Sequence, residues 1–334
     1  MTTLIEKLNN PDSFSDKTNT VSIVQTHISM VFITDNFVYK IKKPVNFDFL
    51  DFSTLEKRQF FCHQEVDLNR RLSKDIYLGV LPVLFDGQNY TIGEEGRGDV
   101  VDYAVKMRRV PEEMLMNSVF KRGELSRKHL ERVAETLASF HKEAQTSKRI
   151  AQFGSPDRFK VNTDENFEQV QKYVGIAIKK SEFEQIQFWT NNFYNKNKAL
   201  FFQRIKDGRI RDCHGDLHME HICLTEDLSV IDCIEFNERF RYSDTVADIA
   251  FLLMDLEYHG GRCEASILWQ LYKERAGEDE VDSLLCFYKV YRAFVRGKVN
   301  SFQLDDEGIG EDKQQEAVER ARKYFGLAGS YIDI

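Results

Sequence analysis

The hydrophobic pattern of the chain changes at about residue 110, and this change narrows the possible folds more than any other feature. From Ser22 to that point, short segments rich in β-branched and aromatic residues follow one another, a pattern typical of strands. Beyond it, apolar residues recur every three or four positions, which indicates helices. Because no low-complexity linker separates the parts, we expect one α+β protein with two lobes. The strand-rich N-terminal lobe is predicted at residues 1–107 and the helical C-terminal lobe at residues 108–334.

The strand-rich part is predicted to contain about five strands and one helix. The segment "MVFITDNFVYKIKK" has the pattern of two strands, with Asp35 and Asn36 in the hairpin turn between them. The helix is predicted over "STLEKRQFFCHQEVDLNRRL", where Ser53 and Glu56 have the spacing of a capping box. Helical periodicity then places Glu65 at the border of the buried stripe.

One strand pattern interrupts the helical part, at residues 221–234. There "HICL", "TEDL" and "SVIDCI" predict two short strands joined by a tight turn. Because a hairpin brings its ends together, we expect Asp216, in the loop before it, to approach Asp232, on its second strand. Two carboxylates and an imidazole suit phosphoryl transfer, in which one carboxylate activates a hydroxyl and another binds Mg²⁺.

Composition limits the partners and the cellular setting. The 54 acidic and 46 basic residues give a formal net charge of -8, and no long block of Lys or Arg occurs. We therefore expect neither nucleic acid nor an anionic membrane as a partner. The first residues are too polar for a secretory signal and the apolar runs are too short to cross a bilayer. These features predict a soluble cytoplasmic protein, a monomer or a homodimer, with its six cysteines reduced.

Three motifs together resemble one enzyme family. "HGDLHMEH", "VIDCIEF" and "RYSDTVADIAFLL" resemble the aminoglycoside-phosphotransferase and choline-kinase branch of the protein-kinase-like fold. In that branch the catalytic loop has the form HGDxHxxN and the metal-binding strand the form IDxE. "YKIKKPVNFDFLDFSTLEKR" is further similar to an uncharacterised bacterial group, sometimes fused to a P-loop kinase-like domain. This sequence contains no P-loop motif.

The resemblance implies an ATP-dependent phosphotransferase that moves the γ-phosphoryl group to a hydroxyl of a small molecule and requires Mg²⁺, or alternatively Mn²⁺. By position, Asp216 would be the catalytic base and His214 its orienting neighbour. His218 would lie near the transferred phosphoryl group, where protein kinases have a lysine. Asp232 would be the main Mg²⁺ ligand. Asp248 would brace the catalytic loop through hydrogen bonds to its backbone.

The resemblance also requires a lysine and a glutamate in the strand-rich lobe. Alternation along "FVYKIKK" places Val38, Lys40 and Lys42 on one face of a strand. Val38 would then cover the adenine, and Lys40 would reach the phosphates with Glu65 as its partner. Lys42 shares the face and is the competing lysine. The glycine-poor turn "QTHISM" would contact phosphate through its backbone or the hydroxyl of Ser29.

One position departs from the family pattern. His221 stands where the family has an Asn that binds a second metal ion, and imidazole suits Mg²⁺ less well than an amide oxygen. Either His221 holds that metal weakly or it has another role, so a kinase-fold nucleotide-binding regulatory protein with little catalysis is the alternative. A kinase acting on a protein is a further one. Zinc on the three histidines of this region is disfavoured, because HExxH is absent and Gly215 predicts a tight loop.

Two other pairs of charged residues each have a functional and a structural interpretation. Glu235 and Glu238 could attract a cationic substrate or form surface salt bridges. Arg292 and Arg296 lie one helical turn apart, so they could face the cleft or form structural pairs, of which we favour the second.

Overall fold

The computed structural model describes residues 2–47, 49–93, 98–306 and 308–332. The chain forms two compact units. The first contains Met1–Glu124 together with Glu220–Glu238, and the second contains Leu125–Met219 together with Arg239–Ile334. The hairpin segment therefore belongs to the same unit as the strands at the start of the chain.

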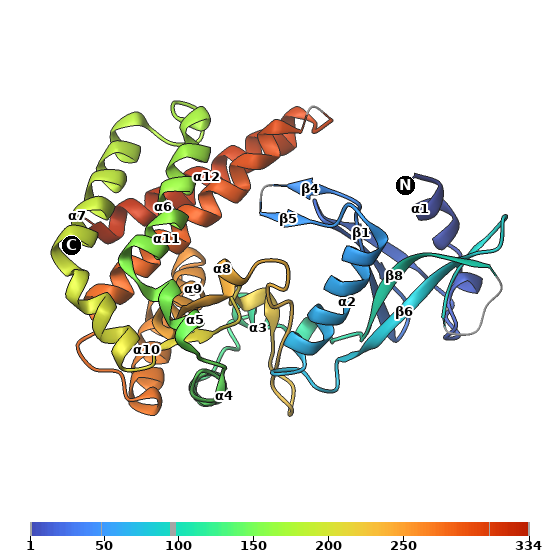
Figure 1. Ribbon diagram of the computed structural model, residues 1–334, viewed down its shortest axis with the longest axis horizontal. Coiled ribbons are helices and arrows are strands. Elements are labelled where there is room, and N and C mark those ends of the chain that lie inside the picture. The colour runs from blue at the N-terminus through green and yellow to red at the C-terminus, as the bar shows by residue number, and fades with distance from the viewer. Residues whose placement is uncertain (1, 48, 94–97, 307, 333–334) are drawn as a thin grey trace. The chain divides into compact units, whose positions relative to one another are not determined.

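An antiparallel sheet forms the centre of the first unit, with the strand order β1-β2-β3-β8-β6-β7 (Figure 1). Its strands are β1 (Ser22–Gln25), β2 (Ser29–Ile33), β3 (Phe37–Lys42), β6 (Tyr77–Phe85), β7 (Tyr90–Ile92) and β8 (Asp99–Arg108). A small hairpin of β4 (Asn46–Phe47) and β5 (Leu50–Asp51) follows β3. The turn predicted at Asp35 and Asn36 joins β2 to β3, where the Thr34 amide donates to the Phe37 carbonyl at 2.9 Å.

Alternation along β3 gives the sheet two different faces. Tyr39 and Ile41 are buried in an apolar cluster with Phe32 and with Leu8 of α1 (Thr2–Leu8). The side chains at even positions point to the opposite face. That face carries α2 (Leu55–Asn69), which packs on β6 and β8 through Cys62 and other apolar side chains (Figure 1).

The start of α2 differs from the predicted capping box. Thr54 is the N-cap, and its hydroxyl accepts a hydrogen bond from the Lys57 amide at 3.3 Å. Ser53 does not take this role because its amide and hydroxyl both donate to Asp51. The cap is therefore one residue later than the sequence spacing indicated, and Glu56 is no longer in the box position.

The small hairpin is shorter than predicted. Its strands are β10 (Ile222–Cys223) and β11 (Ser229–Val230). Asp232, expected on the second strand, lies beyond it with φ of 62°, so the prediction was wrong on this point. A left-handed residue cannot continue an extended ladder, and Asp is one of the few non-glycine residues that adopt this conformation readily.

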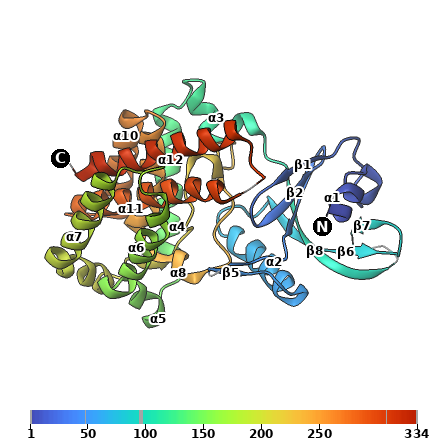
Figure 2. The same ribbon diagram turned by 90° about the horizontal axis from the view of Figure 1, so that it is seen from above.

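Helices make up most of the second unit (Figure 2). The longer ones are α4 (Arg127–Glu143), α6 (Pro156–Val170), α7 (Lys180–Lys206), α9 (Thr245–Tyr258), α10 (Arg262–Ala276), α11 (Asp282–Ser301) and α12 (Glu311–Ile332). Shorter elements are α3 (Met116–Lys121) of the first unit, α5 (Lys148–Ala151), α8 (Glu238–Arg241) and the antiparallel pair β9 (Ile210–Asp212) and β12 (Tyr242–Asp244).

The helix α9 is the centre of the second unit. All of its residues from Thr245 to Leu256 are buried, and α10, α11 and α12 pack around it. A helix that is buried on every side belongs to the interior. In the described part of the chain, neither α9 nor any other helix combines the length and the apolar character needed to cross a membrane.

A close approach of α11 and α12 depends on Gly297. The two helices lie side by side (Figure 2). At their contact, the ring centres of Phe294 and Phe325 are 5.1 Å apart. A Cβ atom added at Gly297 would lie 2.6 Å from the Phe325 ring. Because an aromatic ring in a packed core cannot bend away, we infer that this position requires glycine.

We predict that Gly297→Ala lowers the free energy of unfolding by about 1–3 kcal/mol through overpacking, although alanine favours helix by about 1 kcal/mol. Gly326→Ala in α12 is the matched control, because its added Cβ meets only ordinary contact, at 3.9 Å from Glu182. It should stabilise the protein by up to about 1 kcal/mol. Urea denaturation measures both, and equal stabilisation by both would show that the helices are not in close contact.

Candidate functional site

Two lysines and three carboxylates form one network in the first unit. Lys40 Nζ lies 2.9 Å from Glu65 Oε1 and 2.6 Å from Asp232 Oδ1. Lys42 Nζ lies 2.6 Å from Glu65 Oε2 and also donates to Glu235. Both lysines come from the same face of β3, Glu65 comes from α2, and the other carboxylates follow β11. Three separate segments of the chain thus meet at these charged side chains.

The two lysines have different surroundings. Lys42 is 1% exposed, lies between two buried carboxylates and has its ammonium 4.9 Å from the centre of the Phe52 ring. The side chain of Lys40 is 14% exposed, and that of its partner Asp232 is 44% exposed. Lys40 therefore lies at the accessible end of the network, and Lys42 lies in its interior.

Charge pairing outweighs burial for most members of this network. Burial lowers the pKa of Lys40, but Asp232 and Glu65 raise it well above its usual value. Burial raises the pKa of Glu65, yet Lys40 and Lys42 hold it below its usual value. For Glu235 burial dominates and the pKa is raised despite Lys42. The ion pairs keep the lysines and Glu65 charged in an interior that would otherwise favour their neutral forms.

Asp232 is held in its left-handed conformation by its neighbours. Its amide donates to the Tyr77 hydroxyl at 3.0 Å, and the following Cys233 amide donates to Asn69 Oδ1 at 2.8 Å. His221 Nε2 lies 3.6 Å from Asp232 Oδ2. The two residues predicted as metal ligands are therefore adjacent. A carboxylate suits Mg²⁺, whereas an imidazole suits it less well.

Two further predicted binding residues lie on the same sheet. Val38 is half-buried and pairs with Ile33 and Met107 across the sheet. Ser29 is buried opposite Lys42, and its hydroxyl has no hydrogen-bond partner among the described residues. Their contacts with adenine and phosphate stay predictions.

In the second unit, Asp248 of α9 organises the loop that precedes β10. Its carboxylate accepts hydrogen bonds from the amides of His214 at 3.0 Å and Gly215 at 2.8 Å. The predicted bracing of the loop backbone by Asp248 is thus confirmed. Gly215 has φ of 87°, a conformation that favours glycine and produces the tight turn expected there.

Sequence reasoning missed the residues that support Asp248. His141 of α4 places Nε2 at 3.1 Å from Asp248 Oδ2 and Nδ1 at 2.8 Å from the Tyr272 hydroxyl. Burial raises the pKa of Asp248, but the hydrogen bond from His141 and nearby positive charge hold it below its usual range. The one signal in the sequence is a histidine on the apolar stripe of a predicted helix, and buried histidines of this kind are common in helices that support no catalytic loop.

The braced loop presents Asp216 beside two histidines. The Asp216 amide donates to His214 Nδ1 at 3.3 Å, and Asp216 Oδ2 lies 3.5 Å from His218 Nε2. The Asp216 side chain is 33% exposed, whereas that of His218 is buried. Burial lowers the pKa of His218, but Asp216 raises it above its usual value. A carboxylate that is open to solvent and held by its loop can accept a proton from a ligand.

The predicted site residues therefore fall into two groups, one in each unit. The first unit brings together Lys40, Glu65, Asp232 and His221, and the second brings together Asp216 with the other two histidines. Glu235, considered as a possible attractor of cationic substrates, is buried and paired with a lysine.

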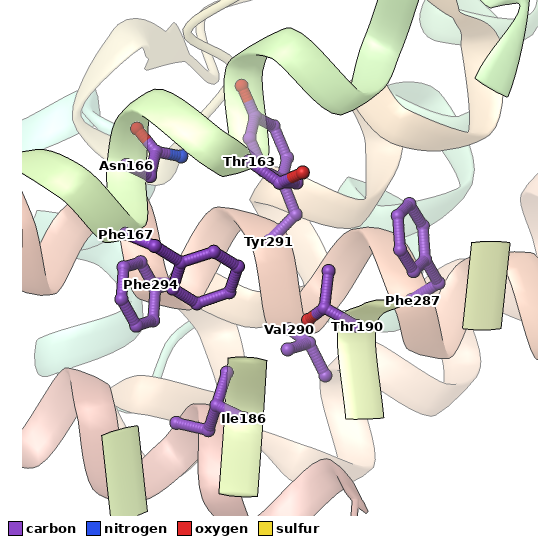
Figure 3. Close-up of a pocket in the computed structure, with 9 residues that line it drawn as sticks. All are labelled: Thr163, Asn166, Phe167, Ile186, Thr190, Phe287, Val290, Tyr291 and Phe294. Carbon is purple, nitrogen blue, oxygen red and sulfur yellow. The ribbon is translucent and has the colours of Figure 1, made fainter. Parts of the chain in front are cut away.

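A cavity in the second unit is too small for a substrate. It lies between α6, α7 and α11 and has a volume of about 10 Å³, which is room for about one water molecule. Figure 3 shows aromatic and aliphatic side chains around it, with a few polar groups. The cavity is thus a packing gap rather than an acceptor site.

Comparisons with known proteins identify the family. A model of the phosphotransferase enzyme family matches residues 58–284. An uncharacterised protein of Mycobacterium tuberculosis is 32% identical over 280 residues, which are 84% of this chain and 54% of that protein. The chain belongs to the phosphotransferase enzyme family. It spans about half the length of the curated relatives it matches.

Solved structures of low identity share the fold. A choline/ethanolamine kinase family protein from Mesorhizobium loti has a TM-score of 0.53 at 10% identity, over 99% of this chain and 98% of that chain. An amicoumacin kinase in complex with AMP-PNP and Ca²⁺ also has a TM-score of 0.53 at 10% identity, over 97% of this chain and 93% of that chain. The predicted two-lobed protein-kinase-like fold is therefore confirmed.

We predict that Asp248→Asn lowers the free energy of unfolding at neutral pH by about 2–4 kcal/mol, because the loop amides lose a charged acceptor. The folded pKa of Asp248 is depressed, so its stabilisation is present above the unfolded value of about 4 and is lost as the pH falls below it.

Urea denaturation at several pH values tests this prediction, since the difference between wild type and variant should shrink on acidification. Asp67→Asn, on the exposed side of α2, should change stability little at any pH. A difference between wild type and Asp248→Asn that is the same at pH values on both sides of that unfolded pKa would contradict the prediction.

We also predict that Lys42→Met lowers the free energy of unfolding by about 3–5 kcal/mol, because the buried carboxylates of Glu65 and Glu235 lose a positive charge that compensates them. Lys40→Met should lower the free energy of unfolding by less, since Glu65 keeps its ion pair with Lys42. Adding Glu235→Gln should recover part of the loss in Lys42→Met, which a double-mutant cycle measures. If the two lysine variants were equally stable, Lys42 would have no special structural role.

Proposed function

We propose that this protein is an ATP- and Mg²⁺-dependent phosphotransferase that moves the γ-phosphoryl group to a hydroxyl of a small molecule. One observation carries the proposal. Lys40 forms an ion pair with Glu65 beside the Asp232 carboxylate in the first unit, and phosphoryl transfer of this kind needs such a lysine–glutamate pair next to a metal-binding aspartate. Membership of the phosphotransferase enzyme family supports it.

Lys40 is proposed to bind the nucleotide phosphates. Its ammonium is fixed by Glu65, and its second partner, Asp232, has a side chain that is 44% exposed. Phosphate oxygens could take the place of that carboxylate. Lys42 is less suited, because two buried carboxylates enclose it.

Asp216 is proposed to orient the acceptor hydroxyl and accept its proton. A bond then forms between the acceptor oxygen and the γ-phosphorus, and the bond to the β,γ-bridging oxygen breaks, which leaves ADP. His214 and Asp248 keep the loop backbone in place. His218 stays beside the carboxylate, where its raised pKa favours the protonated ring that can interact with phosphate oxygen.

Asp232 is proposed to hold Mg²⁺, with His221 as its neighbour. The exposed carboxylate fits a hard cation, while the imidazole fits it less well. The chemistry that Mg²⁺ supplies in such sites is neutralisation of phosphate charge.

His221 favours a second candidate function, a nucleotide-binding regulatory protein with little catalysis. The residue lies beside Asp232 where the family pattern has an asparagine. Acceptor-dependent turnover separates this candidate from the first.

We predict that Asp216→Asn lowers acceptor-dependent ADP release by at least about 100-fold, because it removes the general base, and leaves nucleotide binding nearly unchanged. The assay is a screen of hydroxylated metabolites, sugars and aminoglycosides, with binding measured by thermal shift using ATP with and without Mg²⁺ or Mn²⁺. Asp75→Asn, an exposed substitution in the first unit, is the control.

Undiminished turnover of Asp216→Asn would overturn the assignment of the base. Metal-dependent stabilisation by ATP without turnover on any acceptor would instead favour the regulatory candidate.

A further inference from the structure

Two arginines of α11 lie on the side of this helix that faces the Asp216 loop. Arg292 is buried and donates from Nη1 to the Gly215 carbonyl at 2.9 Å and from Nε to the Ala247 carbonyl at 3.1 Å. It thus has the structural pairing that the sequence favoured. Arg296 is one turn further along the same face, so its side chain lies next to the contact between Arg292 and the loop.

One donor atom of Arg296, its Nε, has no hydrogen-bond acceptor among the described residues. Its Nε is buried and makes no hydrogen bond within the described ranges, although the guanidinium donates a hydrogen bond to the Tyr324 hydroxyl. The guanidinium carbon lies 5.6 Å from the centre of the Tyr324 ring. An arginine cannot shed its proton, and a buried donor without an acceptor costs about 1–3 kcal/mol. A cation–π contact compensates only part of this cost.

An aromatic pair extends from Arg296. The rings of Tyr324 and Tyr258 stack with centres 3.7 Å apart and an angle of 8° between their planes. The ammonium of Lys323 lies 4.1 Å from the centre of the Tyr258 ring. We call these two tyrosines the tyrosine pair. One cation lies over each of its rings.

The charge of Arg296 also acts on the catalytic loop. Burial lowers the pKa of Arg296, but Tyr324 and Asp216 raise it above its usual value. Arg296 in turn opposes protonation of His218. These couplings place the guanidinium within electrostatic reach of Asp216, without a direct ion pair between them. Nearby Asp255 is buried and already accepts the Met219 amide at 2.9 Å.

We propose that Arg296 and the tyrosine pair form a subsite for an anionic group of the acceptor, a carboxylate or a phosphate. Resting on the proposed function, this inference makes the acceptor a hydroxy acid or a phosphorylated alcohol whose hydroxyl faces Asp216. Guanidinium N–H groups match both anions in geometry. The bound anion would supply the missing acceptor for Nε.

The first test measures binding of inorganic sulfate to the full chain while AMP-PNP and Mg²⁺ saturate the nucleotide site. Wild type should bind sulfate saturably, and Arg296→Met should weaken that binding by at least about tenfold through loss of charge-assisted contacts. Arg296→Lys should retain part of it. Arg322→Met, an exposed arginine of α12 that donates to the Ile176 carbonyl, should bind sulfate as wild type does.

Either of two results would overturn the inference: no saturable sulfate binding by wild type, or equal binding by wild type and Arg296→Met. The wild-type titration decides even if Arg296→Met does not fold. Failure of the proposed function would look different, because AMP-PNP itself would not bind or turnover would be absent while sulfate still bound in an Arg296-dependent way.

The second test sorts the acceptor screen by charge, with glycerate, glycerol 3-phosphate, glycerol and serinol as matched three-carbon probes. Turnover should be highest for anionic compounds in the screen, and Arg296→Met should raise KM for them far more than it lowers kcat. A best acceptor that is neutral or cationic and insensitive to Arg296→Met would contradict the subsite.

Discussion

Glu65 remains charged in the interior of the first unit because two lysines hold it there, and the arrangement around it depends on this carboxylate. The helix that carries it must pack on the sheet at one register for both ammonium groups to reach it. The segment after β11 must then approach the same face to supply the remaining negative charges. A buried ion network of this kind fixes geometry more than it adds stability, since desolvation offsets much of the attraction.

In the second unit, too, a buried carboxylate fixes the local geometry, but its partners are hydrogen-bond donors of the backbone and a histidine rather than lysines. Asp248 is a buried carboxylate that collects two loop amides and a histidine, and a tight glycine turn gives those amides a common direction. In both units a charged group in the interior determines the position of a more exposed group, Asp232 in one and Asp216 in the other. The exposed groups can exchange partners with ligands, whereas the buried ones cannot.

Local pattern in the sequence was enough for the order of strands and helices and for the β2–β3 hairpin, because each depends on periodicity or turn residues. The bracing role of Asp248 followed from the family resemblance. Local pattern was insufficient where tertiary contacts decide. Thr54 rather than Ser53 caps α2, because the Ser53 hydroxyl donates to Asp51. The difference between Lys40 and Lys42 arises from carboxylates nearly 200 residues away in sequence. The left-handed backbone of Asp232 likewise has no local signal.

The ion pair between Lys40 and Asp232 makes two binding events interdependent. In the absence of ligands each charge compensates the other. An anion that takes Lys40 leaves the Asp232 carboxylate with less compensation of its negative charge, and a cation that takes Asp232 leaves the Lys40 ammonium with Glu65 as its remaining partner. Thermodynamic linkage then requires that each ligand raise the affinity for the other by the same factor. This ion pair is thus a source of positive cooperativity that needs no change in fold.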